Sequence, residues 1–385
     1  MIYLDHAAAT PIDPRVIAAM EHSLKTDYGN PSGAHALGRV ARQSLSDART
    51  RVARVLGCSP DELIFVGSGT ESDNTAILGV ARAAQRAGRG KHVIVSDIEH
   101  KAVLKAAEVL EREGFDVTRL PVDQHGIVVL GSLKKALRPD TVLVSVMYAN
   151  NEIGTIQPLR ELARLAHAHK VPLHTDACQA AGALPLKVTD LGADLMTLNG
   201  SKIYGPKGVG LLYCRKGVEL DPLIVGGSQE DGKRAGTENL AAIVGFAIAL
   251  EIAEVEREQT SARLVSLRDW AIKKILTEIP SAELTGHATL RLPNNIHVSF
   301  EGIQGDALVS LLDDAGLAAS AGSSCDSKSF APSHVMLALG LPYTRVDGSL
   351  RLTLGRSTTK DQLQKAIDIL RSSVAQLHKR AAPKR

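Results

Sequence analysis

Short apolar segments alternate with segments of helical periodicity through the first half of the chain. The apolar segments have the length of buried strands and are bounded by turn residues. They are residues 63–66, 92–96, 115–120, 141–147, 171–175, 194–198 and 209–214. Strands that alternate with helices predict an α/β domain with a mostly parallel sheet and right-handed crossovers. Because ligands of such sheets bind at the carboxyl ends of the strands, we expect functional side chains directly after strands.

The last third of the chain has a different pattern, which predicts a second domain. Apolar residues recur at helical spacing from about 240 to 279, as one long helix or two. Residues 280–385 then mix strand-like and helical segments, which is typical of a smaller α+β domain. We assign residues 15–255 to the large domain, and residues 1–14 together with 256–385 to the small domain, which carries the loop around Cys325.

The composition is that of an ordinary globular enzyme. Of the 385 residues, 44% are hydrophobic and 23% are charged, and the net charge of +3 is too small to indicate nucleic-acid binding. The longest apolar stretch, 240–250, is too short to span a bilayer, so no membrane partner is expected. The N-terminal segment lacks the pattern of a signal peptide, and the four cysteines lie far apart without metal-ligand spacing. We expect a cytoplasmic protein without a metal or a disulfide.

Lys202 lies on the turn between the last two apolar segments. A lysine that is buried there would have a lowered pKa and a nucleophilic amine, as a Schiff base with a carbonyl or with pyridoxal phosphate (PLP) requires. The alternative is that its ammonium group reaches solvent, as long lysine side chains commonly do. Lys207 is a rival candidate, but Pro206 and Gly208 place it on an exposed turn.

Two further strand ends carry groups that suit such a cofactor. After segment 63–66 the sequence Gly67-Ser68-Gly69-Thr70 leads into a helix, and glycines, a hydroxyl and a helix N-terminus can bind phosphate. An ordinary helix cap is the alternative reading of this turn. Asp176 follows segment 171–175 and could pair with a protonated ring nitrogen, or act as a helix cap.

Other candidate side chains lie after strands or in strand-like sequence. His100 could stack on a ring or carry protons, and Asn151 could bind a carboxylate, although caps and turns use the same residue types. Arg351 lies in an apolar run and could bind a substrate carboxylate or a structural ion-pair partner. Cys325 lies in a run of small and hydroxyl residues, AGSSCDSKS, whose composition predicts an accessible thiol.

Taken in order, these motifs resemble the PLP-dependent cysteine desulfurases of the NifS/IscS type, which have the class V aminotransferase fold (PLP-dependent transferase fold type I). The resemblance runs nearly end to end: YLDHAAATPIDPRV, YGNPSGAH, TESDN, EHKAVL, ANNEIGTIQP, HTDACQA, SKIYGPKGVG, RAGTEN, the SSC loop and LRLTLGR. It implies a homodimer that takes L-cysteine as substrate and passes sulfur to an acceptor or scaffold protein, for iron–sulfur cluster assembly or thiolation.

The resemblance also implies a role for each candidate residue. Lys202 would hold PLP covalently and then take the Cα proton, and Cys325 would accept the sulfur as a persulfide. The remaining cofactor and substrate contacts would be Gly69 and Thr70 to the phosphate, His100 stacked on the ring, Asp176 to the ring nitrogen, Gln179 to the ring hydroxyl, Thr237 to the partner subunit's phosphate, and Asn151 with Arg351 to the substrate carboxylate.

The sequence departs from the family pattern at three places. Asn199-Gly200-Ser201 stands where the family usually has Ser-x-His before the lysine, and Asn199 and Ser201 are expected to replace part of the lost phosphate contacts. Asp231 stands where an arginine is usual, and the sequence has no long tail after the last helix. The alternatives are a selenocysteine lyase, a class V aminotransferase or a non-catalytic sulfur-transfer partner. The thiol of Cys325 speaks against a plain aminotransferase, and Lys202 with Asp176 against loss of the cofactor.

Overall fold

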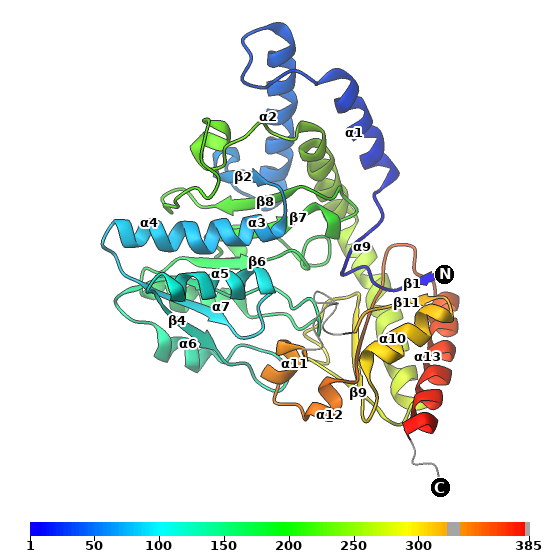
Figure 1. Ribbon diagram of the computed structural model, residues 1–385. Coiled ribbons are helices and arrows are strands. Elements are labelled where there is room, and N and C mark those ends of the chain that lie inside the picture. The colour runs from blue at the N-terminus through cyan, green and yellow to red at the C-terminus, as the bar shows by residue number, and fades with distance from the viewer. Residues whose placement is uncertain (322–331, 382–385) are drawn as a thin grey trace.

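A seven-stranded sheet with helices on both faces forms the larger part of the molecule (Figure 1). The computed structural model describes residues 1–321 and 332–381. In spatial order the strands are β2 (Leu63–Val66), β8 (Gly210–Cys214), β7 (Leu195–Asn199), β6 (Leu173–Asp176), β5 (Thr141–Ser145), β3 (His92–Ser96) and β4 (Asp116–Leu120). The strands from β7 to β4 are parallel, whereas β8 pairs antiparallel with both β2 and β7. The predicted α/β class and mostly parallel sheet are confirmed.

Successive residues of the strands point to opposite faces of this sheet, as the alternation of side chains in a strand requires. Phe65, Ile94 and Met196 pack in one apolar core, and Ile64, Val93 and Leu195 pack in the other. The first core is covered by α1 (Pro14–Thr26), α2 (Ala36–Leu56), α6 (Leu130–Ala136), α7 (Leu159–Ala168), α8 (Val188–Leu191) and the first half of α9 (Leu240–Glu278). The second is covered by the π-helical turn Thr75–Gly79, α4 (Val80–Arg86) and α5 (Lys101–Arg112), and α3 (Gly69–Asn74) directly precedes this turn.

The C-terminal part of the chain builds a separate antiparallel sheet and core. Its strands are β9 (Ala282–Leu284), β10 (Asn295–Phe300) and β12 (Ser349–Thr353), and its helices are α10 (Gly305–Asp314), α11 (His334–Ala338), α12 (Tyr343–Val346) and α13 (Lys360–Ala381). The N-terminal arm joins this part, because β1 (Ile2–Tyr3) pairs with β11 (Leu317–Ala318) and Leu4 packs in the same core. Both features support residues 1–14 as part of the small domain, although the domain boundaries stay a prediction.

Helix α9 is a single helix that passes from one core to the other. Its residues up to Ala253 pack in the first sheet core, and those from Leu264 onward pack in the C-terminal core. The helix that the sequence predicts from about Glu71 to Ala87 differs in one respect. A π-helical turn, Thr75–Gly79, separates α3 from α4, so the segment is not one regular α-helix. Within the described residues, no helix combines the length and the apolar character that crossing a membrane needs.

Candidate active site

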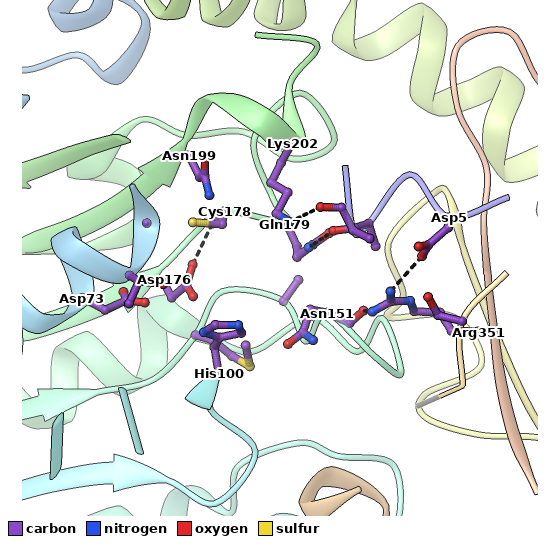
Figure 2. Close-up of a pocket in the computed structure, with 17 residues that line it drawn as sticks. Asp5, Asp73, His100, Asn151, Asp176, Cys178, Gln179, Asn199, Lys202 and Arg351 are labelled. Carbon is purple, nitrogen blue, oxygen red and sulfur yellow. Dashed lines mark hydrogen bonds and ion pairs between the residues drawn. The ribbon is translucent and has the colours of Figure 1, made fainter. Parts of the chain in front are cut away.

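Nine of the predicted site residues line one cavity of about 420 Å³ at the carboxyl ends of the parallel strands (Figure 2). They are Gly69, Thr70, His100, Asn151, Asp176, Gln179, Asn199, Lys202 and Arg351. The main-chain segments that follow β2, β3, β5, β6 and β7 each contribute to the wall, with Asp176 and Asn199 as last residues of their strands. The expectation that functional side chains gather at strand ends therefore describes this cavity well.

Lys202 ends the short 3₁₀ turn Gly200–Lys202 that follows β7 and is half-buried. Its Nζ donates a hydrogen bond of 2.6 Å to the carbonyl oxygen of Ala8 on the N-terminal arm. Lys207 lies on the exposed turn that the sequence predicts, away from the cavity wall. Of the two candidate lysines, the structure brings Lys202 to the cavity.

The sequence left open whether the turn before α3 caps the helix or binds phosphate, and the structure is compatible with both. Ser68 caps the helix, since its Oγ accepts a hydrogen bond of 3.1 Å from Glu71 N–H. Gly69 and Thr70 nevertheless face the cavity. A Cβ at Gly69 would lie 3.0 Å from Cys178 Sγ and 3.4 Å from Asn199 Cβ, so only glycine fits here without displacing its neighbours. The turn is a close-fitting backbone cradle beside the first amides of a helical segment, which suits a phosphate group.

Asp176 is the last residue of β6, and Gln179 lies on the loop that follows it. Asp176 is 7% exposed, and its Oδ1 accepts a hydrogen bond of 2.9 Å from Cys178 N–H. Gln179 donates through Nε2 to Ala7 O at 3.0 Å, which fixes the side chain against the N-terminal arm and leaves its Oε1 for another donor. A buried carboxylate and an amide acceptor at one end of the cavity suit a protonated ring nitrogen and a ring hydroxyl.

Arg351 lies on β12 at the other end of the cavity (Figure 2). It is 3% exposed, its Nη2 pairs with Asp5 Oδ1 at 2.9 Å, and its Nη1 donates to Asn151 O at 2.9 Å. These contacts hold the planar guanidinium in one orientation against Asn151. A fixed guanidinium beside a side-chain amide suits an α-carboxylate.

Two predicted site residues lie outside this cavity wall, and a third is not among the described residues. Ser201 is outside the cavity wall, and its Oγ and N–H both donate to Asn199 Oδ1, at 3.2 and 3.1 Å. It therefore orients Asn199. Thr237 lies in an exposed stretch before α9 and is also outside this wall. Cys325 is outside the described residues.

The cavity also contains residues that the sequence analysis did not single out as site residues. Asp5 and Ser320 come from segments remote in sequence from the sheet, so no local pattern could place them. Asp73 belongs to the quoted TESDN motif, and its position four residues after Gly69 on a helical segment could have suggested it. Cys178 is buried, and burial beside Asp176 raises the pKa of its thiol well above the usual value. Among the described residues, no three His, Cys, Asp or Glu side chains come together as metal ligands.

The chain is similar to known proteins over nearly its whole length. The Aminotransferase class-V family matches residues 2–366. Cysteine desulfurase IscS of Dictyoglomus turgidum is 47% identical over 376 residues, which cover 98% of this chain and 95% of that protein. Cysteine desulfurase IscS of Methanosarcina thermophila is 45% identical and is covered over 92% of its length. A solved NifS-like protein superimposes with a TM-score of 0.91 at 36% identity and covers 98% of this chain.

Proposed function

The chain belongs to the aminotransferase class-V family, and from this premise we propose that it is a PLP-dependent cysteine desulfurase. It converts L-cysteine to L-alanine and passes the sulfur to an acceptor. The observation that carries the proposal is that Lys202, the strand-end carboxylate of Asp176 and the fixed guanidinium of Arg351 share one cavity. The same three groups are the ones that hold a cofactor aldehyde, a ring nitrogen and an amino-acid carboxylate.

The cavity fits PLP. The Gly69 cradle would hold the phosphate through Thr70 and backbone amides, with Asn199, which Ser201 orients, on the same wall. Asp176 would pair with the ring nitrogen, Gln179 with the ring hydroxyl, and His100 would stack on the ring. Bound PLP supplies an electron sink for the charge left at the amino acid's Cα when a bond there breaks.

Each residue then has a defined task in the reaction. Lys202 would hold the cofactor covalently at rest, and its amine, once free, would move the proton at the substrate Cα. Arg351 and Asn151 would fix the substrate carboxylate and so orient the substrate in the cavity. The Cys325 thiolate attacks the substrate sulfur: an S–S bond forms, the Cβ–S bond breaks, and its electron pair stays with the three-carbon fragment. That fragment leaves as alanine after protonation, while the sulfur remains on Cys325 as a persulfide.

We propose that a second copy of this chain completes the site. Thr237 is exposed and outside the cavity of its own subunit, so its hydroxyl is available to a partner's phosphate site. Glu230, in the same segment, is fixed on α2 by Arg49 at 2.7 Å. The face formed by α1, the following loop and α2 exposes apolar side chains that a monomer would leave in water: Ile17, Leu24, Tyr28, Leu37 and Val40.

The acceptor of the sulfur is a thiol on another protein, since a persulfide is transferred by attack of a second thiolate. A reducing compartment, the cytoplasm, keeps both thiols available, and we place the protein there. The acceptor protein determines whether the sulfur enters iron–sulfur cluster assembly or a thiolation reaction.

The test is a product assay with L-cysteine as the only substrate. The protein is loaded with PLP, given L-cysteine and a thiol reductant, and assayed for alanine and sulfide. Alanine and sulfide in equal amounts, with no keto acid present, are the expected result. A product that forms only when a keto acid is added would indicate an aminotransferase, and turnover of selenocysteine alone would indicate a selenocysteine lyase.

A further inference from the structure

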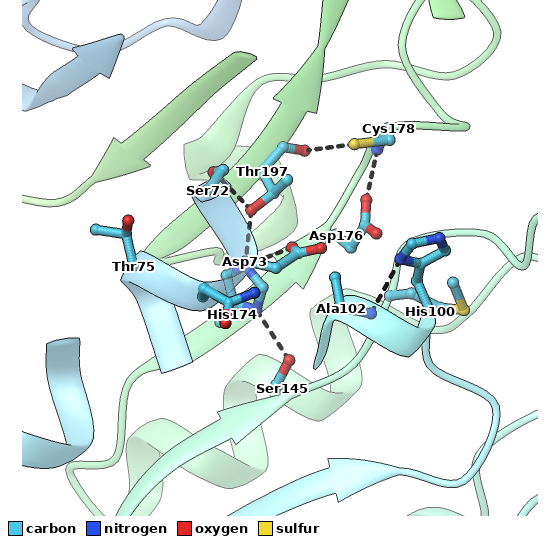
Figure 3. Close-up of polar contacts among 12 residues, drawn as sticks. Ser72, Asp73, Thr75, His100, Ala102, Ser145, His174, Asp176, Cys178 and Thr197 are labelled. Carbon is cyan, nitrogen blue, oxygen red and sulfur yellow. Dashed lines mark hydrogen bonds and ion pairs between the residues drawn. The ribbon is translucent and has the colours of Figure 1, made fainter. Parts of the chain in front are cut away.

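Behind the cavity wall, four buried side chains form a line of hydrogen bonds across β5, β6, β7 and α3 (Figure 3). Ser145 Oγ lies 2.8 Å from His174 Nδ1, and His174 Nε2 lies 3.1 Å from Thr197 Oγ1. Thr197 Oγ1 is in turn 2.8 Å from Ser72 Oγ, which donates to Leu211 O at 2.9 Å. All four side chains are fully buried.

The carbonyl oxygen at one end fixes the direction of every bond in this line. Leu211 O can only accept, so the single hydroxyl hydrogen of Ser72 goes to it. Thr197 must then donate to Ser72, and therefore accepts from His174 Nε2–H. Burial lowers the pKa of His174 to about 4, so the imidazole is neutral and its Nδ1 accepts from Ser145. The hydrogens of these four side chains are therefore all used within the line or by Leu211 O, and none is left for a neighbouring carboxyl group.

That carboxyl group is Asp73, on α3. It is 1% exposed and lies on the cavity wall close to Asp176 (Figure 3). Among the described residues, none donates a hydrogen bond to its Oδ1, and His174 Nε2, already directed to Thr197, is 3.7 Å away. A buried carboxylate oxygen without a donor is costly, whereas a carboxylic acid brings a hydrogen of its own.

The charges around Asp73 also oppose a second negative charge. It faces Asp176 and neutral His174 from β6 and its loop, Glu99 from the segment before α5, and the Cys178 thiol. Burial and the neighbouring carboxylate of Asp176 raise the pKa of Asp73 well above its usual value. Thr197 also interacts with the Asp73 carboxyl and would lower this pKa as a donor, but its hydrogen is used by Ser72. Toward Asp73, Thr197 can therefore only accept, and the hydrogen would have to come from Asp73.

We propose that Asp73 is a positioning residue that is kept as a neutral carboxylic acid behind Asp176, so that Asp176 alone presents negative charge to the cofactor ring. The line Ser145–His174–Thr197–Ser72 maintains this state, because it offers Asp73 an acceptor at Thr197 and no free donor. Two carboxylates at this end of the cavity would oppose each other, and the neutral acid removes that repulsion while filling the same space.

The proposal rests on the proposed function only for the identity of the group that Asp176 faces. The protonation state of Asp73 is a property of the chain itself, and it is measured on the full-length protein with and without PLP. Failure of the desulfurase assignment would leave that measurement unchanged.

The test is carboxyl spectroscopy on protein labelled with ¹³C in the aspartate side chains. At pH 7 the wild-type protein is expected to show a protonated aspartate signal, which is absent in Asp73→Asn and retained in the surface control Asp47→Asn. A wild-type spectrum without a protonated aspartate would overturn the proposal, whether or not any variant folds.

A second measurement separates this role from a charged one. Asparagine has the size and neutrality of the protonated acid, so Asp73→Asn is expected to bind PLP with a Kd within about threefold of wild type. Asp176→Asn, which removes the charge that faces the ring, is expected to weaken binding by more than tenfold. If Asp73→Asn weakened PLP binding as much as Asp176→Asn, Asp73 would be acting as a carboxylate and the proposal would be wrong.

Discussion

At the scale of single residues, the cavity distinguishes two lysines that lie five positions apart. Lys202 reaches the wall and contacts the N-terminal arm through Ala8 O, whereas Lys207 is exposed. Lys202 belongs to the 3₁₀ turn Gly200–Lys202, which directly follows β7, so its side chain lies at the strand end that borders the cavity. We therefore propose Lys202, and not Lys207, as the covalent anchor for the cofactor.

Lys202→Ala should bind no PLP covalently and should lose cysteine turnover, while the fold is retained because the side chain is only half-buried. The measurement is the visible absorbance of protein loaded with PLP, together with alanine formation. Lys207→Ala is the matched control and should behave as wild type. Turnover of cysteine by Lys202→Ala would show that another amine holds the cofactor.

Single residues also show which parts of the site can be predicted from sequence. Asp176 ends a strand of the parallel sheet, and His100 and Asn151 follow two others. The ends of parallel strands converge at one edge whatever the details of packing. The ion pair between Asp5 and Arg351 joins residues 346 positions apart, and depends on how the arm pairs with β11 and β12. No local periodicity contains that information.

At the scale of elements, the junction between β8 and the start of α3 shapes the phosphate cradle. A Cβ at Gly210, the first residue of β8, would lie 2.5 Å from the carbonyl carbon of Ser68. Strand and turn can approach this closely only because Gly210 has no side chain. The position of Gly69 and Thr70 in the cavity thus depends on an element that contributes no side chain to the site.

Gly210→Ala should push the turn away from β8, with a loss of about 1–3 kcal/mol in unfolding free energy and a weaker affinity for PLP. Denaturant unfolding and PLP titration measure the two effects. Gly131→Ala is the control, since a Cβ there meets nothing within 4 Å and Gly131 lies in helix α6. Equal stability and PLP affinity of the two alanine variants would contradict this account of the cradle.

Helices and strands could be predicted from the sequence where the spacing of hydrophobic residues distinguishes a helix from a strand. Strand β2 coincides with the apolar run 63–66, and α9 with the helical periodicity from 240. The π-helical turn Thr75–Gly79 was not predicted, because its apolar residues suit a regular helix equally well. The antiparallel direction of β8 follows from the short connection after β7, which leaves no length for a crossover helix.

At the scale of the whole molecule, buried acids at the contact between the sheet and the C-terminal part make stability depend on pH. Glu99 Oε1 accepts hydrogen bonds from Ser96 Oγ and Met147 N–H, and its Oε2 has no partner among the described residues. The backbone carbonyl of Glu99 contacts the ring of His334, the first residue of α11. Burial raises the pKa of Glu99 to about 8 and that of Glu152, which accepts from Ser333, to about 7. Between the ordinary pKa of glutamate and these raised values, Glu99 and Glu152 are protonated in the folded protein and ionised in the unfolded chain.

Because the folded-state pKa of Glu99 is raised, its protonated form stabilises the fold at low pH, and this contribution is lost as pH rises toward 8. Relative to Glu99→Gln, the wild-type unfolding free energy should fall by on the order of 3 kcal/mol between pH 5 and 8. Denaturant unfolding at several pH values measures the difference, with exposed Glu258→Gln as the control. A constant difference across this range would mean that Glu99 is ionised throughout.

The exposed apolar face of α1 and α2 predicts a homodimer with two sites that share Thr237. Leu24, which is 66% exposed, lies on this face, whereas the half-exposed Leu290 lies in the loop before β10. Leu24→Glu should shift sedimentation toward monomer and weaken PLP binding, and Leu290→Glu should do neither. A monomeric wild-type protein with full PLP occupancy would rule out the shared site.

The central claim is that sulfur leaves cysteine at the Lys202 cofactor site and is received by the thiol of Cys325. Intact-protein mass spectrometry after a single turnover without reductant tests it, alongside the alanine released. Wild type and the Ser variants of Cys58, Cys178 and Cys214 should each gain sulfur and release alanine, whereas Cys325→Ser should gain none and form little alanine. Near-normal alanine from Cys325→Ser, with no sulfur on the protein, would contradict the account.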